Sequence, residues 1–196
     1  IIFLRHQKTI LNNSTYLGQS RNPKIINSKI NIDRNTIYDI IFSSPLKRAI
    51  QTAEMFKFNN LIIDKNLNEI DYGLAEGLKF HDYFNKYPEK LIQWKLGKDP
   101  RFPEGENTKD VFKRILKFLN KRILKSTSNK NINNILVITH NVVLRCLIGY
   151  LLKININYWF KLNINHMEKF EFIIRKSSIL PNFRRNQIKK ITTNIY

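Results

Sequence analysis

The chain has 196 residues, of which 42% are hydrophobic, so we expect a globular protein with a sizeable core and exclude a disordered polymer. Its apolar runs are too short to span a bilayer, no signal peptide precedes the first of them, and a single cysteine excludes an intramolecular disulfide; we therefore expect a cytoplasmic protein with no membrane association. The formal net charge of +19 favours a polyanionic partner, but basic residues occur in every segment, which is more typical of a general drift in composition than of a nucleic-acid-binding surface.

The first third of the chain predicts strands that alternate with a helix. We expect a strand at 1–5, an irregular segment at 8–35, a strand at 38–43, a helix at 44–58 and a short strand at 61–63. The helix begins with Ser44 as its N-cap and Pro45 at its first position, a pairing that favours a helix start.

The rest of the chain continues the alternation. In order we expect a loop at 65–79, helices at 80–86 and 88–96, a long helix at 108–125, a strand at 135–139, helices at 141–152 and 156–161, an edge strand at 170–174 and a last strand at 191–195. Strands that alternate with helices predict an α/β fold, a single-domain three-layer α/β/α sandwich whose mostly parallel sheet is covered on both faces. We expect one domain over 1–196, with a basic tail at 181–196.

Five polar residues fall at predicted strand ends, helix starts or in the loop between them: Arg5, His6, Arg48, Glu69 and His140. Ligands of open α/β sheets bind beyond the carboxyl ends of the strands. Arginines match phosphate oxygens, a neutral imidazole can attack phosphorus, and a carboxyl group can protonate a leaving alcohol. The set suffices for phosphoryl transfer through a phosphohistidine without a metal, although each residue alone is weak evidence, and Asp71 or Glu76 could replace Glu69.

Five sequence blocks, in this order, resemble the signature of the histidine phosphatase superfamily, which includes the phosphoglycerate mutases. LRHQKTILN (4–12) resembles R-H-G-E-T-x-x-N, and SSPLKRAIQTA (43–53) matches S-S-P-L-x-R-A-x-Q-T-A almost letter for letter. LNEIDYGLAEG (67–77) resembles the segment that carries the acid, FPEGEN (102–107) a P-x-G-E-S turn of the phosphatase branch, and VITHNVVLR (137–145) the second-histidine block. The resemblance covers roughly residues 1–175 and implies a phosphoglycerate mutase-like fold.

The resemblance also implies the role of each site residue. His6 is then the nucleophile, and Glu69 protonates the leaving group and later activates water. The phosphoryl oxygens are then held by Arg5, Arg48 and His140, with further contacts from Asn12 and the backbone N–H of Asn141. The imidazole of His6 is then oriented by a hydrogen bond from its other nitrogen, usually to a backbone carbonyl. No metal and no cofactor are expected.

Three departures from the family pattern stand out. Gln7 replaces the glycine that follows the nucleophile, and it would be strained if the position required a positive φ. Lys8 replaces an acidic residue. The segment between Gly18 and the second strand lacks a long amphipathic helix, so the sheet face there is expected to be covered differently or by another subunit, which leaves a homodimer open.

We therefore expect a metal-independent phosphatase that hydrolyses a small phosphorylated metabolite through a phosphohistidine on His6. The alternatives are a phosphoglycerate mutase and a catalytically weak phosphate- or polyanion-binding protein. The substrate itself is left open. The resemblance places a substrate-covering insert at 80–104, where Tyr83, Tyr87, Trp94 and Arg101 could shape specificity. His81 and His166 are interpreted as surface or supporting groups, and Cys146 as a core thiol.

Overall fold

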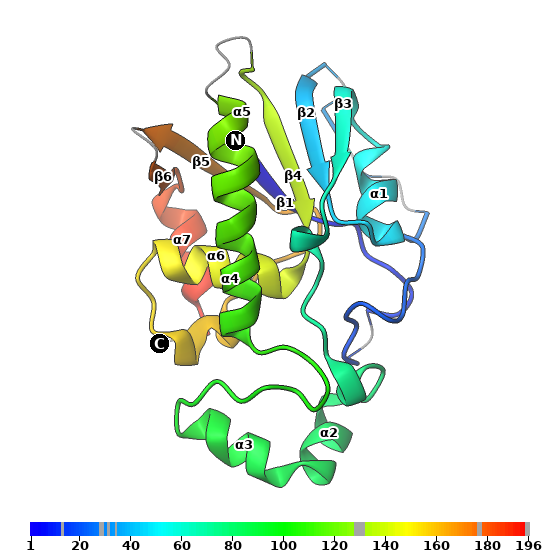
Figure 1. Cartoon of the computed structure of the whole chain (residues 1–196), viewed down its shortest axis with the longest axis vertical. Coiled ribbons are helices and arrows are strands. Elements are labelled where there is room, and N and C mark those ends of the chain that lie inside the picture. Colours follow the sequence, from blue (N-terminus) through cyan, green and yellow to red (C-terminus); the bar gives the residue numbers. More distant parts are fainter. Residues whose placement is uncertain are drawn as a thin grey trace.

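A six-stranded mixed sheet forms the centre of the computed structural model, which describes residues 1–12, 14–27, 30, 32–33, 35–127, 132–175 and 178–194 (Figure 1). The strand order is β3-β2-β4-β1-β5-β6. The strands are β1 (Ile2–Arg5), β2 (Ile37–Ser43), β3 (Lys57–Ile63), β4 (Ile135–Thr139), β5 (Lys169–Arg175) and β6 (Ser178–Pro181).

Four of these strands run parallel to one another. β4 pairs with both β1 and β2, and β2 pairs with β3, whereas β5 runs antiparallel to β1 and β6. The register places Arg5 opposite Thr139, and Ser43 opposite Ile138. The carboxyl ends of β1, β2 and β4 therefore lie side by side, and the residues that follow them meet at one edge of the sheet.

Helices cover both faces of the sheet, as predicted. They are α1 (Lys47–Ala53), α2 (Phe80–Lys86), α3 (Pro88–Lys95), α4 (Thr108–Phe118), α5 (Leu124–Thr127), α6 (Asn141–Leu151) and α7 (Arg185–Thr192), with 3-10 turns at Lys65–Leu67, Gly73–Ala75 and Ile156–Lys161 and a π-helical turn at Leu119–Ile123. In Figure 1, α4 lies along the sheet on the side opposite to α1, and α2 and α3 extend beyond the carboxyl ends of the strands.

Two separate hydrophobic clusters show why the sheet is covered twice. Alternate residues of a strand point to opposite faces. Phe3 of β1 belongs to the cluster that includes Ile115 of α4, whereas its neighbour Leu4 belongs to the cluster that includes Ala49 of α1. All four side chains are completely buried. The three-layer α/β/α arrangement predicted from the sequence is confirmed.

Several predicted elements differ in the structure. The helix expected to begin at the Ser44 N-cap starts at Lys47, with Leu46 as its N-cap, and the strand expected at 61–63 begins at Lys57. The helix expected to reach residue 58 ends at Ala53, since the N–H of Phe56 turns back to the carbonyl of Ala53 and the chain from Lys57 onward pairs with β2. The strand expected at the edge, β5, is internal because β6 pairs with its outer side. The last strand was expected at 191–195, but residues 191–192 belong to α7, where Ile191 is fully buried; residue 195 lies outside the described residues.

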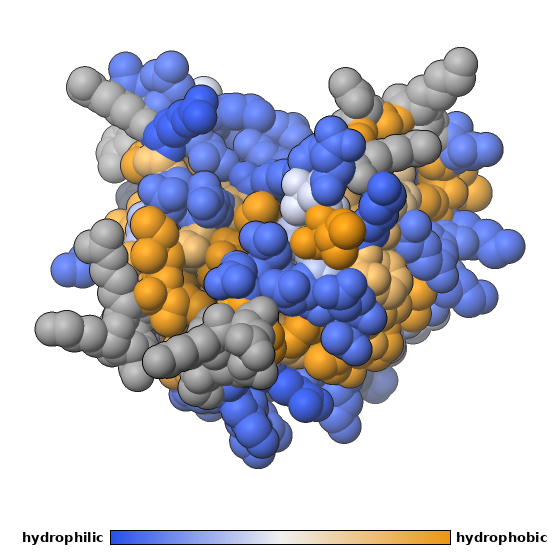
Figure 2. Space-filling model, turned by 90° about the horizontal axis from the view of Figure 1, so that it is seen from above, coloured by the Kyte–Doolittle hydropathy of each residue, from blue (hydrophilic) through white to orange (hydrophobic). Residues whose placement is uncertain are grey.

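The end of the molecule at the amino ends of the parallel strands is mostly hydrophilic. Figure 2 shows hydrophilic side chains spread over this face, with smaller hydrophobic patches between them. No helix in the described part of the chain is long and apolar enough to cross a membrane.

Candidate active site

Two buried histidines meet at the carboxyl ends of β1 and β4. His6 follows β1, and His140 follows β4 and precedes α6. The N–H of His6 donates a hydrogen bond of 3.0 Å to the carbonyl of Thr139, which ties the two strand ends together. The ring centroids of His6 and His140 are 4.9 Å apart, and the two residues are 3% and 0% exposed. Parallel pairing of distant segments thus brings the two predicted histidines into contact.

A backbone carbonyl orients the imidazole of His6. Its Nδ1 lies 2.6 Å from the carbonyl oxygen of Gln7, which can only accept a hydrogen bond. In the neutral ring Nδ1 therefore carries the proton, and Nε2 carries the free lone pair. Burial lowers the pKa of His6 well below its usual value, and the nearby positive charge of Arg48 lowers it further. The neutral tautomer is the nucleophilic form.

Two arginines lie beside these histidines. Arg48 of α1 is completely buried, and its Nη2 donates to the carbonyl of Gly18 at 2.7 Å. Arg5 donates to the carbonyl of Ile164, and burial lowers its pKa to about 10, so the side chain stays charged at neutral pH. The Nε atoms of both arginines are buried without a hydrogen-bond partner among the described residues. They are donors suited to an anion.

Glu69 lies next to the same cluster and contacts the start of α6. Its carboxylate accepts the N–H groups of Asn141 and Val142, at 3.1 Å each, and that of Ile70 at 3.0 Å. Burial raises the pKa of Glu69, although these N–H donors and the charges of Arg48 and Arg5 oppose the shift. A raised pKa favours the protonated acid that a leaving alcohol needs.

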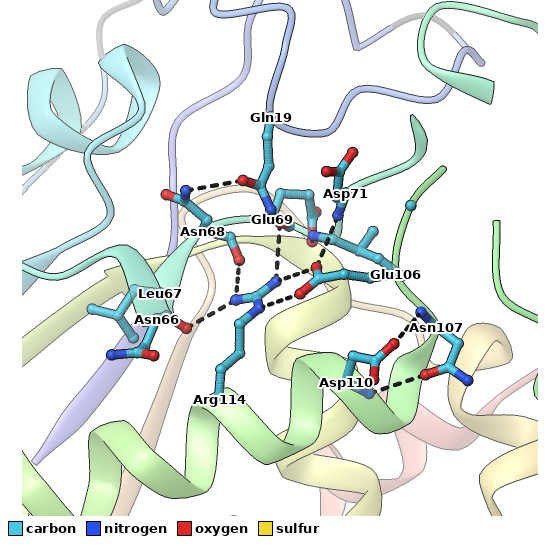
Figure 3. Close-up of polar contacts among 12 residues, drawn as sticks. Gln19, Asn66, Leu67, Asn68, Glu69, Asp71, Glu106, Asn107, Asp110 and Arg114 are labelled. Atoms are coloured by element: carbon cyan, nitrogen blue, oxygen red, sulfur yellow. Dashed lines mark hydrogen bonds and ion pairs between the residues drawn. The ribbon is translucent and has the colours of Figure 1, made fainter. Parts of the chain in front are cut away.

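A partly buried ion pair holds the backbone of Glu69 in place (Figure 3). Arg114 of α4 donates to the carbonyls of Asn66, Asn68 and Glu69 at 2.8, 2.6 and 3.0 Å. The same guanidinium contacts Glu106 through two bonds of 2.9 and 3.0 Å, and Glu106 in turn accepts the N–H of Asp71. One side chain therefore fixes the loop that carries the acid, although the sequence offered no reason to single it out.

His140 differs from His6 in its hydrogen bonds. Neither of its ring nitrogens has a partner among the described residues. Burial lowers the pKa of His140 well below its usual value, and the charge of Arg48 and the proximity of His6 act in the same direction. A buried polar group without a partner costs free energy, so His140 is poised to bind a group that enters the site.

Two predicted phosphate contacts are already engaged with the protein. The Oδ1 atom of Asn12 accepts the N–H and the hydroxyl of Thr9 at 2.8 and 3.0 Å. The N–H of Asn141 donates to Glu69 at 3.1 Å. Both residues stabilise the loops around the cluster in this structure, and their contacts with phosphate stay predictions.

The structure distinguishes between the three candidate acids. Asp71 accepts the N–H of Gly73 at 2.9 Å and so stabilises its own turn. Glu76 accepts the N–H of Gly18 with both carboxylate oxygens at 2.9 Å. Glu69 is the carboxylate whose charge acts most strongly on both Arg5 and Arg48. It is therefore the acid placed at the histidine–arginine cluster.

Gln7 fits its position without the backbone strain that a glycine site would impose. It is absent from the described non-glycine residues with positive φ. Its N–H donates to the hydroxyl of Thr52 at 3.0 Å, and its side-chain oxygen accepts the N–H of Lys8 at 2.8 Å. The side chain is buried and shapes the wall next to His6.

His166 is a member of the site that the sequence did not reveal. Its ring centroid lies 5.5 Å from that of His6, and its Nε2 is buried without a partner among the described residues. Burial lowers its pKa to about 3, and the charges of Arg5 and Lys8 add to the effect. The antiparallel pairing of β5 with β1 places residues just before β5 where β1 ends, and no sequence pattern indicated this pairing.

His81 lies outside this cluster. It is exposed on α2, as expected, while Cys146 is fully buried in the core. Among the described residues, no group of three or more His, Cys, Asp or Glu side chains is arranged to hold a metal ion.

Several proteins of known function are similar to this chain over part of its length. Phosphoserine phosphatase 1 of Hydrogenobacter thermophilus is 33% identical over 115 residues, which are 56% of this chain and 52% of that protein. The 2,3-bisphosphoglycerate-dependent phosphoglycerate mutase of Cytophaga hutchinsonii is 31% identical over 117 residues, 57% of this chain and 54% of that protein. Human 6-phosphofructo-2-kinase/fructose-2,6-bisphosphatase 3 is 32% identical over 119 residues, 60% of this chain and 21% of that protein. The chain thus spans about half of the first two relatives.

Solved structures share the fold at lower identity. The α-ribazole phosphatase of Shigella flexneri has a TM-score of 0.67 at 19% identity, covering 92% of this chain and 93% of that one. A mycobacterial glucosyl-3-phosphoglycerate phosphatase in complex with VO3 has a TM-score of 0.68 at 19% identity, covering 93% and 95%. The sequence profile of the histidine phosphatase superfamily (branch 1) matches residues 33–176, a region that contains Arg48, Glu69 and His140 and begins after Arg5 and His6. The chain therefore belongs to the histidine phosphatase superfamily.

Proposed function

We propose that the protein is a metal-independent phosphatase that hydrolyses a small phosphomonoester through a phosphohistidine on His6. The observation that carries the proposal is the hydrogen bond between Nδ1 of His6 and the carbonyl of Gln7. It leaves the Nε2 lone pair free in a cluster with His140 and two arginines, and a buried carboxyl group completes the set.

In the first step, Nε2 of His6 attacks phosphorus and a P–N bond forms. The bond between phosphorus and the ester oxygen breaks, and Glu69 gives its proton to the departing alcohol. The guanidinium groups of Arg5 and Arg48 neutralise the phosphoryl oxygens. His140, whose ring nitrogens have no partner in the described part of the chain, donates a hydrogen bond to an oxygen as charge develops there.

In the second step, water attacks the phosphohistidine. Glu69, now a carboxylate, takes a proton from the water, the P–N bond breaks, and its electron pair returns to Nε2 of His6. The products are inorganic phosphate and the free enzyme. The raised pKa of Glu69 suits both steps because the group must give and take a proton.

A phosphoglycerate mutase is the second candidate, because one relative of similar identity is such a mutase. In a mutase the phosphoryl group on His6 passes to a hydroxyl of the substrate rather than to water. The two functions therefore differ in their products and not in the first step. A weak polyanion-binding protein, suggested by the charge of +19, would form no phosphoenzyme.

The test is release of inorganic phosphate from a panel of phosphomonoesters and phosphoglycerates, with and without a chelator. We expect release that survives chelation and is abolished in His6→Ala but kept in the control His81→Ala, whose side chain is 80% exposed. Interconversion of phosphoglycerates without release would make the protein a mutase. No turnover, together with salt-sensitive binding to nucleic acid, would indicate the polyanion binder.

The covalent intermediate can be trapped independently. Quenching the enzyme after it has met a labelled phosphomonoester should give a phosphoenzyme that is labile in acid and stable in base. Peptide mapping should place the label on His6. A label on any other residue would refute the assigned roles.

A further inference from the structure

A large cavity adjoins the acid side of the proposed catalytic cluster. Its volume is about 600 Å³, within the range of small-molecule sites. At one end it is lined by Ile70, Asn141 and Val142, the residues whose N–H groups donate to the carboxylate of Glu69. The cavity therefore borders the residues that hold the carboxylate of Glu69.

Most of the cavity lining is aromatic or aliphatic. The rings of Trp94 in α3 and Phe160 are stacked, with their centroids 5.8 Å apart and their planes tilted by 22°. The ring centroid of Trp94 also lies 5.6 Å from that of Phe84. At the other side, Tyr16 and Phe80 meet edge to face at 4.6 Å. These rings pack against one another and together form an aromatic wall against which a flat ring can pack.

Part of the ring surface at this cavity is exposed. Phe80 is 50% exposed and Phe160 is 46% exposed, and α3 contains no fully buried residue. Aromatic side chains of this kind are covered in most folded proteins, so exposed ones around a concave site mark a place for an apolar ligand.

The charged groups of the lining are few. Arg145 lies at the inner end, where its Nε donates to the carbonyl of Leu162 at 2.8 Å, and Lys95, Lys98 and Asp99 belong to the part of the lining formed by α3 and the segment after it. A polyol placed against the aromatic part of the lining would exchange water for ring surface and lose hydrogen bonds. An aromatic carbon skeleton would lose no hydrogen bonds on entering this part of the cavity.

We propose that the cavity binds the alcohol part of the substrate, and that this part carries an aromatic ring. The substrate class is then an aromatic phosphomonoester rather than a phosphorylated sugar, hydroxy acid or amino acid. The inference rests on the proposed function, because it takes the phosphoryl group to lie between His6 and His140.

The experiment compares two esters that differ only in a ring, 3-phenylpropyl phosphate and propyl phosphate, whose leaving alcohols are similar in acidity. We expect kcat/KM to be at least tenfold higher for the phenyl ester than for propyl phosphate and for phosphoserine. The ratio between the first two should fall toward one in Trp94→Ala and in Phe160→Ala. It should persist in Ile92→Ala, the control on the same helix, whose 58% exposed side chain is outside the cavity lining.

A binding measurement separates the cavity from catalysis. Calorimetry should show that 3-phenylpropylphosphonate binds at least tenfold more tightly than propylphosphonate, with the selectivity lost in Phe160→Ala. Phosphate release at equal kcat/KM from both esters would overturn the aromatic pocket and leave the phosphatase intact. Selective phosphonate binding without any turnover would refute the phosphatase and support the pocket. Equal phosphonate affinities would overturn the pocket.

Discussion

Burial beside two arginines makes His6 and His140 unusual among histidines, because both must stay neutral in the folded protein. Each is nearly or completely buried, and burial lowers the pKa of each well below its usual value. In the unfolded chain the same side chains take up protons near pH 6.5. The reactive state of the nucleophile and the stability of the fold are therefore linked through the same two residues.

This linkage predicts that the protein becomes less stable as the pH falls from 7 to 5.5. A group whose pKa is lowered by folding binds its proton in the unfolded state first, so its contribution is complete above pH 6.5 and is lost below it. Each of these two histidines adds a slope of up to about 1.4 kcal/mol per pH unit, and His166, whose pKa is lowered to about 3, adds to it in the same direction. Glu69 affects the free energy of unfolding in the opposite sense, because folding raises its pKa. Its contribution to stability is present at low pH and is lost as the pH rises through its pKa in the folded protein.

Urea denaturation at several pH values in phosphate-free buffer measures the slope. His140→Gln should make it shallower, since one of the two buried imidazoles is removed. A free energy of unfolding that stays constant between pH 7 and 5.5 would mean that the histidines are protonated in the fold.

Gln7 supports a second prediction at the residue scale. Its φ is not positive, and its N–H and side-chain oxygen are both engaged. Gln7→Gly should therefore relieve no strain and should lower the free energy of unfolding by about 1 kcal/mol, because glycine is more flexible in the unfolded chain. Equilibrium denaturation checks this; an increase in stability would show that the position prefers a positive φ.

At the scale of elements, the site depends on the junction between α4 and the loop that carries Glu69. The capping box of Asn107 and Asp110 fixes where α4 begins (Figure 3). Arg114 then lies one turn further along the helix and reaches three loop carbonyls and Glu106. The position of the acid is thus set by a helix that supplies no reacting group.

Removing this guanidinium should disturb both stability and catalysis. Arg114→Ala leaves Glu106 largely buried without its partner, and we expect a loss of roughly 3 kcal/mol in the free energy of unfolding. We also expect a lower kcat for a phosphomonoester, because the Glu69 backbone loses its anchor.

Arg101→Ala is the matched control. The ion pair of Arg101 with Asp110 is on the surface, with the arginine side chain 55% exposed, and should cost about 1 kcal/mol or less. Denaturation curves and initial rates of both variants decide the question. If Arg114→Ala cost no more than Arg101→Ala, the junction would not hold the acid.

At the scale of the whole molecule, a net charge of +19 surrounds a site that contains two buried arginines. Hydrophilic side chains are spread over the end of the molecule opposite to the site rather than confined to one stripe (Figure 2). A positive net charge of this size attracts anions, and it accelerates the arrival of a phosphorylated substrate without specifying one.

This field predicts that kcat/KM for a phosphomonoester falls several-fold between 20 and 200 mM NaCl, because added salt screens attraction between charges that are farther apart than the Debye length, about 10 Å at 0.1 M. The turnover number kcat should change little, since the arginines of the site are buried. Initial rates at several salt concentrations test this. A kcat that falls in parallel with kcat/KM would point to an effect inside the site.

The strand ends and their neighbours could be predicted from the sequence because short patterns determine them. An apolar run that ends in Arg5 and His6, and a second that ends in His140, indicate two parallel strands, and parallel strands end at the same edge. The serine–proline start before Arg48 is equally local. The three-layer fold follows from such patterns, since alternation of strands and helices leaves few arrangements.

The tertiary structure alone decided what depends on contacts between distant segments. The contacts of the Glu69 carboxylate with the start of α6, the approach of His166 to His6, and the anchoring by Arg114 each join segments that no local pattern relates. The C-terminal segment likewise forms a helix because its one buried side chain, Ile191, packs onto the core. Sequence periodicity reports which face of an element is buried, whereas the polar contacts of a loop are set by whatever the completed fold brings beside it.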